Sequence, residues 1–306
     1  MRTNSDRLIM LSVVGEVTNP SMRGYRISHD GRPIVLPGVG GITYNLRVGD
    51  PATGWVADHV EPGVSIRNLT KDREGLPPTN DGLNFLACVG NEATVLSGDA
   101  KGAKGTVTGK HGGIEHVLVD FAPEILEVLQ IGDKIGIKAF GTGLALLDHP
   151  AVTVMNLDPR ILPRMPVAEK KGAFVVGVTH AVPAALMGSG LGADTCYRGD
   201  YDIQLFDART VEEYGLSDLR LGDLVAILDT EHAYGRVYKS GALSIGIVVH
   251  SDCVVSGHGP GVTTLFTSAD SRALQYRLDA KANLADFLGL RKERARKTTP
   301  RNGSRR

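Results

Sequence analysis

The chain has 306 residues, of which 42% are hydrophobic and 22% charged, a composition typical of a soluble globular protein with one large domain or two of ordinary size. Its 38 glycines follow no fixed period, which excludes a collagen-like chain, and its 5% aromatic content disfavours a stacking platform for single-stranded nucleic acid. The formal net charge of zero hides a split, because residues 291–306 carry eight Lys or Arg and one Glu, whereas residues 1–290 carry 26 basic and 33 acidic side chains.

The first half of the chain predicts a small barrel. Residues 8–17 form a strand-like apolar run, and five further short strand candidates with glycine-rich turns lie at 85–90, 92–98, 105–112, 116–121 and 134–140. Residues 50–83 show little periodicity and hold Asp58, His59 and Glu61, which predicts a long loop that is either a mobile surface segment or functional. We therefore expect a β-barrel-like domain over residues 1–150.

The second half of the chain predicts strands mixed with short helices. Prolines within residues 150–166 mark a boundary, strand-like runs follow at 174–178, 201–206, 224–228 and 243–252, and helical spacing at 276–288 predicts a last helix closed by Gly289. We expect a mixed α+β domain over 151–290 and a disordered basic tail over 291–306. The predicted fold class is β-rich α+β, an N-terminal barrel-like half packed on a mixed α/β C-terminal half, rather than a Rossmann fold or a TIM barrel.

The cysteine usage and the apolar runs indicate the compartment. Three cysteines without a CxxC pair favour a reducing environment over a disulfide framework. The first residues lack a signal-peptide pattern, and no apolar stretch approaches the about 18 residues of a membrane span. We expect a cytoplasmic protein with no membrane contact that forms a homo- or hetero-oligomer.

Residues 241–268 contain the strongest candidate for chemistry. His250 and Asp252 lie on one face about 7 Å apart if the strand continues to Asp252, and His258 follows in the glycine loop Gly-His-Gly-Pro-Gly. This pattern predicts either an acid–base or metal-binding cluster or a histidine bonded within its own hairpin. We expect Asp252 and His250 to act as base and acid, with His258 as an electrostatic partner.

Two further stretches hold candidate residues. The glycine loop of residues 188–194 predicts either a nest of N–H groups for an anion or a tight turn, and its candidate ligands are Gly188, Ser189, Gly190, Gly192 and Asp194. His180 precedes this loop, and His232 follows the strand at 224–228, where a site or a plain hairpin turn fits equally. A divalent metal held by His180, His232, His250 and Asp252 is possible, whereas the absence of a P-loop or dinucleotide fingerprint predicts no nucleotide cofactor.

Three sequence resemblances add to this interpretation. The stretches VGGITYNLRVGD, GDAKGAKGTVTGKHGGIEHVLVDF and SIGIVVHSDCVVSGHGPGVTTLFTS, with GSGLG between them, resemble a bacterial and archaeal family defined only as a domain of unknown function. That resemblance covers residues 8–290 and implies a β-barrel N-terminal part and a separate C-terminal part, but it transfers no catalytic residues. The histidine and glycine loops are also similar to those of acetamidase/formamidase hydrolases, and residues 98–113 are similar to a KOW-type barrel hairpin.

The combined pattern predicts an enzyme that acts on a small polar, anionic metabolite. The expected reaction is hydrolysis, or elimination of an anionic leaving group in a biosynthetic pathway, by general acid–base chemistry with or without a metal. The alternative is a non-catalytic protein that binds RNA or a partner through the barrel and the basic tail. Nucleic acid is the less expected partner, and a small-molecule substrate is the more expected one.

Overall fold

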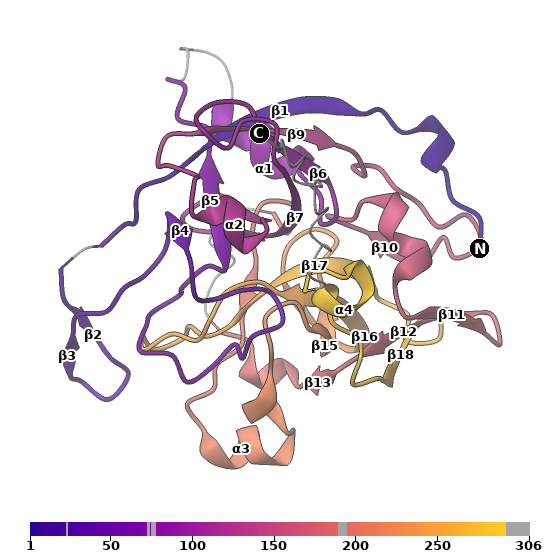
Figure 1. The fold of residues 1–306 in the computed structure, drawn as a ribbon. Helices are drawn as coiled ribbons and strands as arrows, with labels where there is room; N and C mark the ends of the chain where they lie inside the picture. Colours follow the sequence, from indigo (N-terminus) through magenta and orange to yellow (C-terminus); the bar gives the residue numbers. More distant parts are fainter. Residues whose placement is uncertain (23, 72–73, 75–77, 189–194, 292–306) are drawn as a thin grey trace, which may run out of the picture.

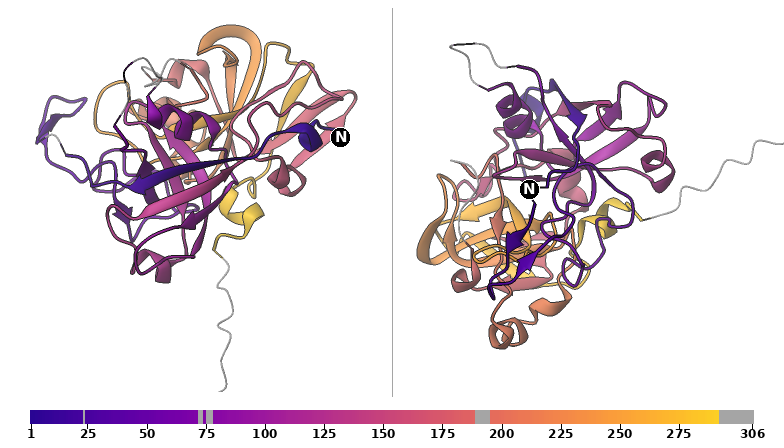
Figure 2. Two further views of the ribbon diagram at one scale, coloured as in Figure 1. Left: turned by 90° about the horizontal axis from the view of Figure 1, so that it is seen from above. Right: turned by 90° about the vertical axis from the view of Figure 1, so that its left-hand side faces the viewer.

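The computed structural model describes residues 1–22, 24–71, 74, 78–188 and 195–291. It confirms the β-rich α+β fold class, because strands form most of the regular structure and the four α-helices of the described residues are short: α1 (Thr79–Leu86), α2 (Pro123–Leu126), α3 (Ala208–Glu213) and α4 (Leu284–Leu288). An N-terminal barrel and a strand-rich C-terminal half lie side by side (Figures 1 and 2).

The N-terminal half is a closed barrel, as expected. Within the described residues its six strands run in the order β1 (Leu11–Val17), β9 (Lys134–Ala139), β6 (Glu92–Val95), β7 (Lys104–His111), β8 (His116–Asp120) and β5 (Gly63–Arg67), and β5 pairs with β1 to close the ring. The short strand β4 (Ile42–Thr43) extends the sheet beside β5. Inward side chains such as Val64, Ile66, Val107 and Ile135 are fully buried and form the barrel core.

The structure replaces one predicted barrel strand with a strand that the sequence did not signal. Residues 85–90 do not form a strand, because Phe85 and Leu86 end helix α1. The missing barrel strand is β5, which lies in the segment predicted to be a loop. Its short run Gly63–Arg67 has no exposed residue and therefore no polar–apolar alternation to signal it.

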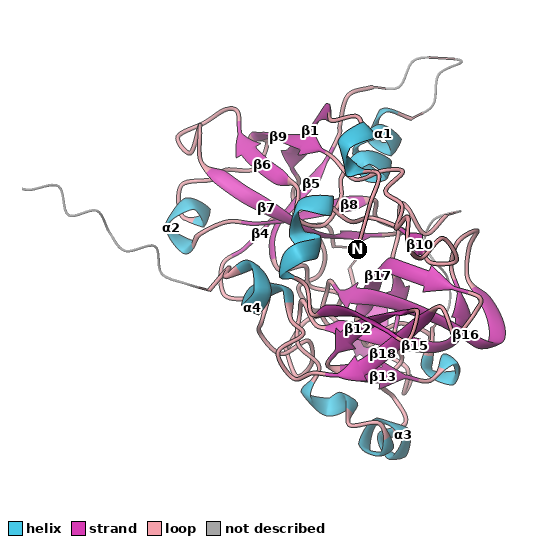
Figure 3. Cartoon of the chain, turned by 90° about the vertical axis from the view of Figure 1, so that its right-hand side faces the viewer, coloured by secondary structure: helices cyan, strands magenta, loops and turns pink. Residues whose placement is uncertain are grey.

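The C-terminal half contains two sheets. The larger one has the order β10 (Thr153–Val154), β17 (Gly261–Ser268), β16 (Val237–Val248), β15 (Leu224–Glu231) and β13 (His180–Val182), with β14 (Tyr201–Asp202) paired to β17. The smaller one has the order β11 (Val167–Lys170), β12 (Ala173–Val178) and β18 (Leu274–Leu278), and Figure 3 shows β12 and β18 beside the larger sheet. A hairpin of β2 (Arg26–Ile27) and β3 (Pro33–Ile34) projects from the N-terminal half. Four 3₁₀ turns complete the described elements: Ser5–Arg7, Pro159–Arg164, Ala184–Leu186 and Leu216–Asp218.

The predicted last helix is only partly correct. Residues Leu274–Leu278 form strand β18 in parallel with β12, and the helix is limited to Leu284–Leu288. Asn283 caps its start by accepting a hydrogen bond from the Ala285 amide, and Gly289 ends it with a φ of 69°. Parallel pairing with β12 outweighs the helical spacing of the preceding residues.

One of the buried hydrophobic clusters spans both halves. A single buried cluster includes Leu118 of β8, Leu157 of the connecting segment, and Ile245 and Phe266 of the C-terminal sheet. Gly109 of β7 permits this approach, because a Cβ atom there would lie 2.2 Å from a methyl carbon of Val249. The barrel strand β7 therefore lies directly against the C-terminal sheet, and a cluster of histidine and aspartate side chains lies at this junction.

Candidate metal centre

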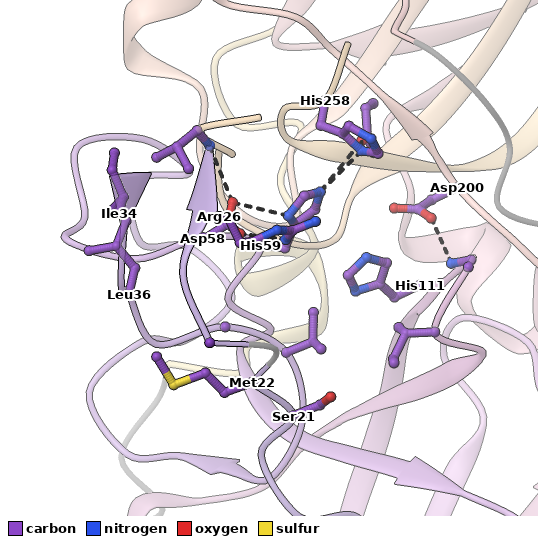
Figure 4. Close-up of a pocket in the computed structure, with 18 residues that line it drawn as sticks. Ser21, Met22, Arg26, Ile34, Leu36, Asp58, His59, His111, Asp200 and His258 are labelled. Atoms are coloured by element: carbon purple, nitrogen blue, oxygen red, sulfur yellow. Dashed lines mark hydrogen bonds and ion pairs between the residues drawn. The ribbon is translucent and has the colours of Figure 1, made fainter. Parts of the chain in front are cut away.

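A cavity of about 430 Å³ opens where the barrel meets the C-terminal half. Its mouth is lined by the β2–β3 hairpin, including Arg26 and Ile34, and Figure 4 shows His59, His111, Asp200 and His258 on its polar side. Four of the chain's nine histidines gather there together with acidic residues.

His111 and Asp200 line the base of the cavity, and His250 lies behind them with its ring stacked on that of His111 at 4.1 Å; we call these three residues the floor triad. One ligand-type atom from each lies within 4.8 Å of the others, and all three residues are buried. Asp200 Oδ2 lies 2.8 Å from His250 Nε2, yet the N–H direction of the ring does not align with the oxygen. Neither atom has a hydrogen-bond partner within the described part of the chain. Two buried polar atoms that face each other in this way are suited to share a cation.

Hydrogen bonds from outside the cavity orient the floor triad. His111 Nδ1 donates to Glu61 Oε1 at 2.7 Å, and His250 Nδ1 donates to the carbonyl oxygen of Ser251 at 2.8 Å. These bonds leave Nε2 as the atom that each ring would offer to a cation. The Gly112 amide donates to Asp200 Oδ1 at 2.7 Å, which leaves Oδ2 free. A histidine held through Nδ1 by a carboxylate or carbonyl is the usual arrangement of metal ligands.

A second group, which we call the rim triad, consists of His59, Asp202 and His258. His258 Nδ1 lies 2.8 Å from Asp202 Oδ2 and 3.3 Å from His59 Nε2, and His59 Nε2 lies 3.7 Å from Asp202 Oδ2. The His258 side chain is 36% exposed, whereas those of His59 and Asp202 are nearly buried. His59 has a φ of 58°, an uncommon conformation for a non-glycine residue and one that concentrates at functional sites.

An ion pair closes the outer side of the rim triad. Asp58 accepts a hydrogen bond from Arg26 at 2.5 Å and another from the Cys253 thiol at 2.9 Å. Burial raises the pKa of Cys253, and the bond to Asp58 raises it further, so this thiol is not an activated nucleophile. The Arg26 side chain remains 46% exposed at the mouth and has further N–H groups for an anion.

The buried carboxylates make the cavity floor attractive to cations. Burial alone would raise the pKa of Glu61, but its contacts with His116 and His111 hold it well below its ordinary value. Burial alone would lower the pKa of His250, but Asp200 and Asp202 raise it well above its ordinary value. A site that binds a proton this tightly offers the same stabilisation to a metal ion.

Gly261 leaves space for the floor triad. A Cβ atom at this position would lie 1.8 Å from Asp200 Oδ2 and 2.2 Å from His250 Nε2. The pairing of β14 with β17 places Asp202 opposite Gly261, so the same glycine lies next to both triads. Only glycine fits here without displacing the two free ligand atoms.

The structure brings together some of the predicted site residues. His250 and His258 belong to the floor and rim triads. Asp252 follows His250 but does not line the cavity: strand β16 ends at Val248, so the expected common face does not exist, and Asp252 Oδ2 accepts a hydrogen bond from the Gly54 amide at 3.2 Å.

The other predicted residues lie apart or outside the described residues. His180 Nε2 contacts Asp218 at 2.8 Å, and buried His232 contacts the Thr264 hydroxyl at 2.8 Å, so neither ring joins a triad. The Gly188 amide donates to the Asp202 carbonyl, which links the start of the glycine loop to β14. Ser189, Gly190, Gly192 and Asp194 lie outside the described residues, as does the tail from residue 292 onward.

Four residues of the triads were not singled out as leading candidates. His59 lies in the long loop whose role the sequence leaves open, and the sequence patterns assign no role to His111, Asp200 or Asp202. A usable signal was the start of strand β14, where Asp-Tyr-Asp follows a glycine and places two carboxylates two residues apart on one side of the chain.

The fold and the site define a two-part β-rich protein with a histidine–carboxylate cluster at the junction of its parts. Two family models, described as the N-terminal and C-terminal domains of unknown function DUF4438, match residues 25–163 and 164–288, and the chain belongs to this family. This confirms the resemblance expected from the sequence, whereas the similarity to acetamidases is not shown and stays a prediction.

A solved structure described as the crystal structure of TM1086 is similar to the chain. It shares 49% sequence identity and a TM-score of 0.88, over 94% of this chain and 99% of that one. No curated protein matches. Among the described residues, no helix has the length and apolar character required to cross a bilayer.

Proposed function

We propose that the protein is a metal-dependent enzyme that hydrolyses a small anionic metabolite or eliminates an anionic leaving group from it. The observation that carries this proposal is the floor triad, in which Asp200 Oδ2 and His250 Nε2 lie 2.8 Å apart, buried and without hydrogen-bond partners in the described residues. Two imidazoles and one carboxylate suit Zn²⁺, Mn²⁺ or Fe²⁺.

The surrounding residues support this chemistry. A divalent ion at the floor would polarise a substrate oxygen or lower the pKa of a bound water. Glu61 keeps the Nδ1 proton on His111, and the Ser251 carbonyl keeps the Nδ1 proton on His250, so each ring would offer its Nε2 atom to the ion. Arg26, half-exposed at the cavity mouth, favours a substrate with negative charge. The proposal therefore gives His250 a ligand role in place of the acid role, and it gives Asp252 no catalytic role.

Metal binding tests the proposal directly. We expect chelator-treated protein to bind Zn²⁺ with micromolar or tighter affinity by calorimetry, and His111→Ala to lower that affinity at least 100-fold. His180→Ala, which removes a histidine outside the cavity, is the matched control and should leave the affinity unchanged. Equal Zn²⁺ affinity in wild type and His111→Ala would overturn the assignment.

Activity provides the second test. Metal-loaded and metal-stripped protein should be compared against small carboxylate, phosphate-ester and sulfate-ester compounds, with product detected by mass spectrometry. Product formation that needs the metal and is lost in His111→Ala would support the proposal, and metal-independent turnover would contradict it.

The RNA-binding alternative receives less support from the barrel. Lys110, which lies in the KOW-like stretch of residues 98–113, is fully buried, and Lys104 in the same stretch donates to Glu92 at 3.0 Å. The predicted oligomeric state and the cytoplasmic location stay predictions.

A further inference from the structure

The spacing of the rim triad matches that of ligands around one metal ion. Two ligand atoms at about 2.1 Å from an ion lie about 3.0–3.4 Å apart in octahedral or tetrahedral geometry. The three separations in the rim triad, between His59 Nε2, His258 Nδ1 and Asp202 Oδ2, are 2.8, 3.3 and 3.7 Å. Small displacements of the side chains would place all three atoms around one cation.

Asp202 connects the rim triad to the floor triad. Its Oδ2 faces His258 and His59, whereas its Oδ1 lies 3.5 Å from His250 Nε2. The two oxygens of one carboxylate therefore contact both triads.

The backbone holds the rim histidines in place before any ligand arrives. The His59 amide donates to the Asp252 carbonyl at 3.0 Å, which fixes the left-handed turn at His59. On the opposite side of the ring, His59 Nδ1 lies 3.3 Å from Asp58 Oδ1, which leaves Nε2 toward the cavity. This is again a carboxylate behind an imidazole, as Glu61 is behind His111.

We infer that His59, Asp202 and His258 bind a second divalent cation beside the one in the floor triad, with the Asp202 carboxylate shared between the two ions. This inference rests on the proposed function, because the second ion shares a ligand with the first. It gives the site the arrangement of two-metal hydrolases, in which paired ions about 3.5–4 Å apart hold the attacking and the leaving oxygen of an anionic substrate. The competing interpretation is one ion, with His258 and Asp202 as a hydrogen-bonded acid–base pair.

Metal stoichiometry separates the two interpretations. Full-length protein should be loaded with Zn²⁺, freed of excess metal and measured by elemental analysis. We expect two equivalents in wild type, one in His258→Ala and two in the control His180→Ala. In Mn²⁺-loaded protein, electron paramagnetic resonance should show a spin-coupled pair in wild type and isolated ions in His258→Ala.

Other metal stoichiometries would contradict one or both of the metal sites. One equivalent in both wild type and His258→Ala, lost in His111→Ala, would overturn the second site and leave the floor triad intact. One equivalent that is lost in His258→Ala and kept in His111→Ala would overturn the floor assignment and, with it, the paired centre. No bound metal in wild type would overturn both. Circular dichroism of each variant confirms that it is folded.

Discussion

Neighbouring residues of strand β7 lead into two buried polar regions with opposite properties. Lys110 Nζ donates to three oxygens, Asn156 Oδ1 at 2.7 Å, the Tyr197 carbonyl at 2.6 Å and the Phe85 carbonyl at 3.5 Å, and we call this group the Lys110 network. Burial lowers the pKa of Lys110 to about 8. His111, the next residue, belongs instead to the floor triad, where two ligand atoms have no hydrogen-bond partner in the described residues.

The comparison distinguishes a buried polar network that stabilises the fold from a buried polar group that is suited to bind a ligand. Every N–H of the Lys110 ammonium has an acceptor, so the network links the barrel to the C-terminal half and leaves no group for a ligand. The floor triad leaves lone pairs unused at the base of a cavity, an arrangement that costs stability in the folded protein and is compensated when a cation binds. Variants in each of the two regions test this contrast.

Gly261→Ala should abolish metal binding at the floor. The added Cβ would overlap the positions of Asp200 Oδ2 and His250 Nε2, so both ligands must move. We expect Zn²⁺ affinity by calorimetry to fall at least about a thousandfold, because two ligands are displaced and even indirect partners of a ligand are worth 10–100-fold. Gly82→Ala is the control, since a Cβ atom there meets no neighbour. Unchanged affinity in Gly261→Ala would place the metal elsewhere.

Asn156→Ala should damage stability and spare the metal site. The side chain accepts from Lys110 and donates to the carbonyls of Cys196 and Thr264, so its loss removes one of the three acceptors of a buried ammonium and the side-chain donor to two buried carbonyls. We expect a loss of about 3 kcal/mol in the free energy of unfolding, measured in urea, with Zn²⁺ affinity within twofold of wild type.

A glycine variant provides the control for the backbone. Asn156 has a φ of 51°, so Asn156→Gly keeps the backbone conformation that alanine strains. Most of the loss should persist in Asn156→Gly if the hydrogen bonds cause it. Full recovery in the glycine variant would assign the loss to backbone strain instead.

His232 should make stability depend on pH without contributing to the metal site. Burial lowers its pKa to about 3, and the nearby Arg236 lowers it further, so below its ordinary pKa of 6.5 the unfolded chain binds a proton that the folded chain does not. Through this group the free energy of unfolding falls by about 2 kcal/mol between pH 7 and pH 5. His232→Gln should remove that part of the pH dependence in urea denaturation, and identical pH profiles would contradict the burial argument.

Asp252→Asn should have the smallest effect. Asparagine keeps an oxygen that can accept from the Gly54 amide, and Asp252 does not line the cavity. We expect the free energy of unfolding to change by less than about 1 kcal/mol and Zn²⁺ affinity by less than twofold. A large drop in turnover with unchanged metal content would instead restore Asp252 as the catalytic base.

Local sequence patterns predicted several of the strands and two of the six triad residues. Strands β6 to β9 follow short apolar runs separated by glycine turns, and these signals depend only on neighbours in the chain. His250 and His258 could be predicted for the same reason, since His250 follows a strand and His258 lies in a glycine loop. Strand β5 and the short extent of helix α4 could not be predicted in this way, because both depend on strand pairing between segments far apart in the chain.

The amino-acid sequence by itself determined that the protein is β-rich and that its first half is a barrel, and its prediction of a site near residues 250–258 named two of the six triad residues. Only the tertiary structure decided which histidines act together. His59 comes from the loop before β5, His111 ends strand β7, and Asp200 and Asp202 come from the segment beside β17, so the triads join residues nearly 200 positions apart. Packing of β7 on the C-terminal sheet through Gly109, and the open space at Gly261, bring these groups together, and such long-range contacts leave no local periodicity in the sequence.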